Sequence, residues 1–165
     1  MSITAIVRAA GVASALACAA IALGSAACTP GSGEALGAAE AVAIAGEHAE
    51  DVDSFERWAL RIAAADTTFP SRAAIEEAAF APVRGQTGIE GAWIERAGPD
   101  PWRLAHPRRA SLPNDLAWRR ARLTGLHEYE VARAGTLRYV RARSETSGGA
   151  TLVVTLAFEP DDAAD

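Results

Sequence analysis

A cluster of arginines beside a tryptophan is the part of this sequence best suited to chemistry. Three arginines follow Trp118 within four residues, and Gly125 ends the segment. A guanidinium presents a planar set of donors that fits a carboxylate or a phosphate, and a neighbouring ring excludes water. The segment therefore predicts a site for a small anion. The candidate ligand-binding residues in it and in the strands expected after it are Trp118, Arg120, Tyr129, Arg138, Tyr139 and Arg141.

The distribution of charge favours the same ligand class. Residues 29–100 include thirteen acidic residues and five arginines, whereas residues 101–143 include three acidic residues and ten arginines. A basic middle between acidic flanks can steer a small anion, although solvated arginines on a sheet would give the same counts. The net charge of −5 argues against nucleic acid as a partner. The chain lacks lysine, which excludes a lysine-containing phosphate loop and a Schiff base.

No residue set specifies a reaction. His48, His106 and His127 are not spaced as metal ligands, and the sequence has no GxSxG motif. The two cysteines, Cys18 and Cys28, are too few for a zinc site or a disulfide framework. We therefore expect no enzymatic activity, no metal centre and no cofactor.

The first 28 residues have the composition of an export signal. Arg8 precedes an apolar run over 9–23, and small residues lead to Cys28. The run is shorter than the roughly 20 residues that span a bilayer. We expect residues 1–27 to be a lipoprotein-type signal peptide, Cys28 to be lipidated, and 28–33 to be a flexible tether. Ordinary cleavage near Ala26 or Ala27 and an uncleaved anchor are the alternatives.

The remaining chain predicts a single α+β domain over 34–160, followed by an acidic tail over 161–165. Three- and four-residue spacing of apolar side chains predicts a long helix over 34–65, with a break near Gly46 or 51–53. Ser71 caps a short helix over 72–80. A further helix is expected from Ser111 or Asn114 to Leu123, with Arg120 on its apolar side. The five expected strands are 92–96, 102–105, 127–134, 136–144 and 150–159.

This order of elements resembles the PAS-like fold of bacterial extracytoplasmic Cache sensor domains. The stretch from Trp118 to Gly125 looks like the W-(Y/F)-R-x-A…G segment of that family, with Arg119 in place of its aromatic residue, and 153–157 looks like its closing strand. The resemblance implies a long N-terminal helix packed on a mainly antiparallel five-stranded PAS/Cache-like sheet. It also implies that Trp118 and Arg120 hold a ligand carboxylate.

The resulting expectation is an exported, membrane-anchored sensory domain, on the periplasmic or outer side, that binds a small anion and acts through a partner protein. One alternative is a structural or interaction lipoprotein of the cell envelope without a small ligand. The other is a cone-shaped, nuclear-transport-factor-like domain, in which Asp66 and His127 would form an enzymatic pair.

Overall fold

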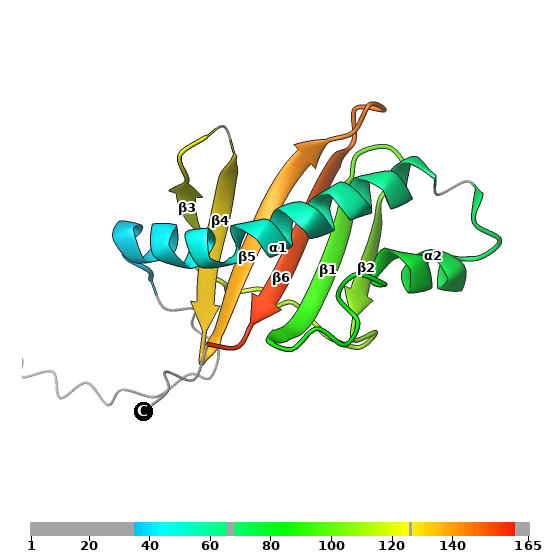
Figure 1. Cartoon of the computed structure of the whole chain (residues 1–165). Coiled ribbons are helices and arrows are strands. Elements are labelled where there is room, and N and C mark those ends of the chain that lie inside the picture. The colour runs from blue at the N-terminus through cyan, green and yellow to red at the C-terminus, as the bar shows by residue number, and fades with distance from the viewer. Residues whose placement is uncertain (1–34, 66–67, 126, 161–165) are drawn as a thin grey trace, which may run out of the picture.

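A long helix lies across one face of an antiparallel sheet (Figure 1). The computed structural model describes residues 35–65, 68–125 and 127–160. Its elements are α1 (Ala38–Ala64), α2 (Arg72–Ala79), β1 (Ile89–Ala97), β2 (Trp102–His106), β3 (Arg119–Arg122), β4 (Glu128–Ala134), β5 (Leu137–Glu145) and β6 (Thr151–Phe158). The strand order is β2-β1-β6-β5-β4-β3, with antiparallel neighbours throughout. The predicted α+β class is confirmed, with six strands where the sequence predicted five.

The helix α1 is continuous and amphipathic. Its buried side, which faces the sheet, consists of Ala41, Ile44, Ala45, Val52, Phe55, Glu56, Ala59 and Ile62. The predicted break near Gly46 or 51–53 is wrong, because one glycine costs a helix only about 1 kcal/mol and packing on the sheet outweighs that cost. The predicted short helix is confirmed as α2, where the Ala74 backbone N–H donates to Ser71 Oγ at 3.2 Å.

The helix predicted to end at Leu123 is absent from the structure. Residues 111–118 are irregular, and Arg119–Arg122 form β3. The chain must cross from β2 at one edge of the sheet to β3 at the other, a distance of about 24 Å at roughly 4.8 Å per strand. The twelve residues 107–118 would span only about 18 Å as a helix. An extended segment reaches the far edge, and a helix does not.

The sheet is covered on both faces. On the helix face, α1 packs on side chains that include Ile94, Val140 and Leu156. On the opposite face, called the far face here, a second cluster is covered by residues of segment 107–118. That cluster consists of Trp93, Leu116, Ala132, Tyr139 and Ala157, with Ala110, Leu112 and Trp118 packed against it. The strand β6 is central in the sheet, and its side chains are buried on both faces.

Among the described residues, none of the helices combines the length and the apolar character that crossing a membrane requires. The predicted signal peptide over 1–27, Cys28, the tether over 28–33 and the acidic tail over 161–165 lie outside the described residues. Their predicted roles stay predictions.

Candidate functional site

A cavity of about 410 Å³ lies where β3, β4 and β5 adjoin. In the sheet register Glu130 lies opposite both Arg120 and Arg141, and ion pairs between strands join Glu130 to Arg141 and Glu128 to Arg120. The cavity contains more cationic than anionic side chains. The residues that line it are Arg120, His127, Glu128, Glu130, Arg141 and Arg143.

Glu130 organises the inner part of this cavity. Its Oε2 accepts hydrogen bonds from Nε of Arg141 at 2.7 Å and from Nε of Arg143 at 2.9 Å. Burial alone would raise the pKa of Glu130, but the hydrogen bonds and charges of the two arginines outweigh it and lower that pKa below its usual range. Glu130 is therefore ionised at neutral pH and fixes both guanidinium groups.

The outer part of the cavity is looser. Nε of Arg120 lies 3.5 Å from Oε1 of Glu128, and Arg122 approaches the other oxygen of Glu128 at 3.9 Å. The Arg120 side chain is 78% exposed. The expectation that Arg120 faces inward from an apolar helix side is therefore wrong. On the edge strand β3 its position alternates with that of buried Ala121, which directs Arg120 outward.

Two of the predicted aromatic residues, Trp118 and Tyr139, pack on the far face of the sheet. The guanidinium carbon of Arg141 lies 3.8 Å from the centre of the Trp118 ring, in a cation–π contact. Tyr139 packs against Trp93, with ring centroids 6.2 Å apart, and burial raises the pKa of its hydroxyl. Trp118 thus borders the arginines, while Tyr139 contributes to the packed cluster beneath segment 107–118.

The other two predicted residues lie on the helix face. The Tyr129 hydroxyl donates to Oδ1 of Asp53 at 2.6 Å, and Arg138 donates to Oε2 of Glu47 at 2.9 Å. Both acceptors belong to α1. The structure therefore brings together Trp118, Arg120 and Arg141, and it separates them from Tyr129 and Arg138.

The predicted ligand-binding residues do not include four that line the cavity: His127 and the three strand residues Glu128, Glu130 and Arg143. A signal for the three strand residues was present, because Glu128 and Glu130 alternate along a strand in the same way as Arg141 and Arg143. Opposite charges at alternate positions of neighbouring strands predict cross-strand pairs.

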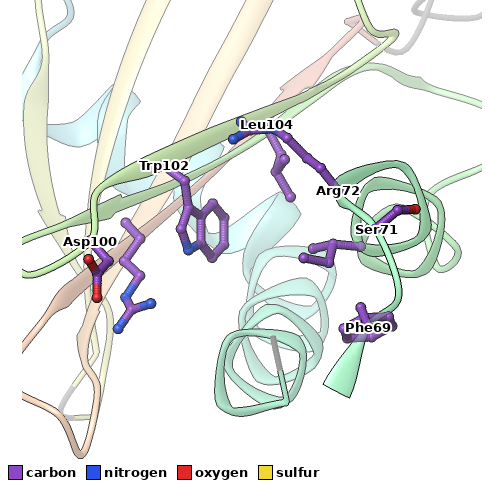
Figure 2. Close-up of a pocket in the computed structure, with 8 residues that line it drawn as sticks. Phe69, Ser71, Arg72, Asp100, Trp102 and Leu104 are labelled. Carbon is purple, nitrogen blue, oxygen red and sulfur yellow. The ribbon is translucent and has the colours of Figure 1, made fainter. Parts of the chain in front are cut away.

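A second cavity, of about 530 Å³, has a different character. It lies between the β1–β2 hairpin and α2, where Figure 2 shows Trp102 and Leu104 projecting from β2. The Arg72 side chain at its margin donates to the backbone oxygen of Arg103 at 2.7 Å. Four of its eight lining residues are apolar, and Arg72 is bonded to the backbone, so this cavity suits an anion less well than the cavity at β3, β4 and β5. The lining residues are Phe69, Ser71, Arg72, Ile75, Arg96, Asp100, Trp102 and Leu104.

His127, at the start of β4, contacts carboxylates of α1. Its Nε2 lies 3.1 Å from Glu56 Oε2 and 3.8 Å from Asp53 Oδ1. Asp66, the partner suggested for His127 in the nuclear-transport-factor-like alternative, lies outside the described residues.

Comparison of the chain with protein-family models, with curated proteins and with solved structures finds no match in any of the three. The arguments about function therefore rest on the sequence and on the geometry of these sites.

Proposed function

We propose that this protein is a non-enzymatic domain that binds a small carboxylate or phosphate compound in the arginine cavity of the far face. The main support is the convergence of Arg120, Arg141 and Arg143 from two strands on a cavity with two carboxylates. Three guanidinium groups against Glu128 and Glu130 leave a positive balance, which favours an anion.

The inner and outer arginines of the cavity would contribute to binding in different ways. Arg141 is held between Glu130 and the Trp118 ring, so its orientation is fixed before a ligand arrives. A fixed donor loses little conformational entropy on binding, which favours affinity. Arg120 is exposed and only loosely paired, so it can turn towards the ligand and close over it. The Cache-like interpretation, with Trp118 and Arg120 at the ligand, is compatible with this division.

The test is a titration of the full chain, purified in detergent, with a panel of small carboxylates and with inorganic phosphate. Isothermal calorimetry and thermal melting should reveal at least one anion that binds saturably. Arg120→Gln should weaken that anion tenfold or more, because a charged hydrogen bond contributes about 1.5–3 kcal/mol. The matched control is Arg138→Gln, whose side chain pairs with Glu47 on the other face. Equal affinity in Arg120→Gln and the wild type would refute the proposal, and binding of no anion would favour the interaction-lipoprotein alternative.

We further propose that Cys28 carries a lipid that anchors the domain to the cell envelope, where it acts through a partner protein. The support is the run of small residues before Cys28 that follows a short apolar stretch. Labelled palmitate should enter the wild type in a bacterial host and should not enter Cys28→Ser. Equal labelling of the two chains would contradict the anchor without affecting the cavity.

A further inference from the structure

Three side chains of types that can ligate a metal ion, Asp53, Glu56 and His127, lie together where α1 meets the start of β4. His127 also borders the arginine cavity. One oxygen each of Asp53 and Glu56 and one ring nitrogen of His127 lie within 4.8 Å of one another. Asp53 and Glu56 are three residues apart on α1, so their side chains emerge on the same side of the helix. His127 is the residue immediately before β4.

One member of this group, Glu56, is deeply buried. The Glu56 side chain is only 6% exposed, and a carboxylate buried to that degree requires compensation for its lost hydration. Ser144 donates a hydrogen bond to Glu56 Oε1. The other oxygen, Oε2, faces Nε2 of His127 at 3.1 Å. That nitrogen is itself buried and makes no hydrogen bond of acceptable geometry. Glu56 Oε2 and His127 Nε2 are therefore close together but not joined by a hydrogen bond, although the His127 side chain as a whole is 41% exposed.

The distance between His127 and Glu56 suits a common ion. Zinc binds imidazole nitrogen and carboxylate oxygen at about 2.1 Å, which places two ligand atoms roughly 3.0–3.4 Å apart at right-angled to tetrahedral geometry. The separation of 3.1 Å between His127 and Glu56 lies in that range. The 3.8 Å between His127 Nε2 and Asp53 Oδ1 is longer than that range, so the Asp53 side chain would have to move to bind the same ion.

Hydroxyl groups hold both carboxylates: Tyr129 at Asp53 Oδ1, the oxygen nearer His127, and Ser144 at Glu56 Oε1, the oxygen that does not face His127. Tyr129 donates to Asp53 at 2.6 Å, and Ser144 donates to Glu56. Such outer hydrogen bonds fix the orientation of metal ligands and tune the affinity of the site.

We propose that Asp53, Glu56 and His127 form a binding site for a divalent transition-metal ion such as Zn²⁺ or Mn²⁺. One imidazole and two carboxylates favour these ions over Ca²⁺ and Mg²⁺, which prefer oxygen ligands alone. Three protein ligands leave at least one coordination position for water or a ligand. The inference departs from the sequence-based expectation of no metal centre, and it stands whether or not the arginine cavity binds an anion.

The first experiment is a titration of the full chain with Zn²⁺, Mn²⁺, Ca²⁺ and Mg²⁺, followed by calorimetry and thermal melting. The chain carries a purification tag without histidine, and Cys18→Ser and Cys28→Ser remove competing thiolates. We expect one saturable site for Zn²⁺, with weaker Mn²⁺ binding and at least tenfold preference over Ca²⁺ and Mg²⁺. Glu56→Gln and His127→Gln should each weaken Zn²⁺ binding tenfold or more.

Two controls are matched to these variants. Glu128→Gln changes a neighbouring carboxylate that belongs to the arginine cavity, and His106→Gln changes a histidine on β2. Both should keep the Zn²⁺ affinity of the parent chain. The proposal is overturned if no ion binds saturably up to about 1 mM, or if Glu56→Gln and His127→Gln bind Zn²⁺ as tightly as the controls.

A second measurement addresses variants that fail to fold. In the parent chain, Co²⁺ should shift or broaden the imidazole NMR signals of His127 much more than those of His106. A stronger effect on His106, or equal effects on both, would overturn the proposal without any variant.

Discussion

Glu130 illustrates how one carboxylate can set the chemistry of the arginine cavity. It accepts hydrogen bonds from two arginines and is only 19% exposed, so its charge is little screened by water. The charge of Glu130 also cancels part of the charge that an anion would meet. Glu130 therefore fixes the geometry of the cavity but weakens its attraction for an anion.

Replacing Glu130 by Gln should make stability less dependent on pH. The pKa of Glu130 is lower in the folded chain than its ordinary value of 4.5, so its ionised form stabilises the fold above that value. This stabilisation is lost as pH falls from 4.5 through the folded pKa. At pH 7 we expect Glu130→Gln to lower the free energy of unfolding by about 1–2 kcal/mol. Urea denaturation at a series of pH values should show the difference shrinking below pH 4.5.

The matched control for this prediction is Glu128→Gln. Glu128 is 41% exposed, and its contacts with arginines are 3.5 and 3.9 Å long. Exposed pairs of this kind contribute about 0–1 kcal/mol. A larger loss of stability in Glu128→Gln than in Glu130→Gln would contradict the central place given to Glu130.

At the residue scale, the sequence identified the arginines and did not identify their partners. Trp118, Arg120 and Arg141 were chosen because their chemistry suits anions, and residue type is visible in a sequence. The group of Asp53, Glu56 and His127 joins residues more than seventy positions apart. Only the packing of α1 on the sheet brings them together, so no local spacing could have predicted it.

At the scale of elements, α1 depends on one buried side. Phe55 is only 1% exposed and stacks against Phe80, with ring centroids 6.1 Å apart, which joins α1 to the end of α2. The side of α1 away from the sheet has no comparable contact at Val42, which is 40% exposed.

Removing the Phe55 ring should therefore destabilise the domain strongly. We expect Phe55→Ala to lower the free energy of unfolding by about 3–5 kcal/mol, because a large buried ring leaves a cavity. Val42→Ala, on the exposed side of the same helix, should change it by no more than about 0.5 kcal/mol. Urea denaturation followed by circular dichroism measures both. Similar losses in the two variants would mean that α1 does not pack on the sheet through this side.

The sequence predicted a helix or strand correctly where its apolar pattern agrees with the route that the chain takes through the fold. Apolar spacing predicted α1 and α2, and alternation predicted β1, β2, β4, β5 and β6 to within a few residues at their ends. The helix predicted within residues 111–123 was wrong. The apolar spacing there fits a helix, but the chain must run from one edge of the sheet to the other. The length of a crossing depends on the strand order, which the sequence alone did not supply.

At the scale of the whole molecule, two different covers protect the two faces of one sheet. The helix face is covered by α1, and much of the far face is covered by the irregular segment 107–118. Each cover is tied by a tryptophan N–H. Trp58 Nε1 donates to the backbone oxygen of Ala78 at 2.9 Å, which ties α1 to α2. Trp93 Nε1 donates to the backbone oxygen of Ala110 at 3.2 Å, which ties β1 to segment 107–118.

Removing each of these two hydrogen bonds in turn tests whether the two covers open independently of each other. Trp93→Phe keeps a ring in the far-face cluster and removes the N–H, at a cost of about 1 kcal/mol. Since 1.4 kcal/mol corresponds to a tenfold change in an equilibrium, segment 107–118 should open about fivefold more often. Trypsin should then cleave after Arg108 and Arg109 about fivefold faster.

Trp58→Phe should speed cleavage after Arg72 and Arg84 instead, because the lost hydrogen bond ties α1 to α2. If either variant accelerated all four cleavages equally, the domain would open as one unit and the two covers would not be independent.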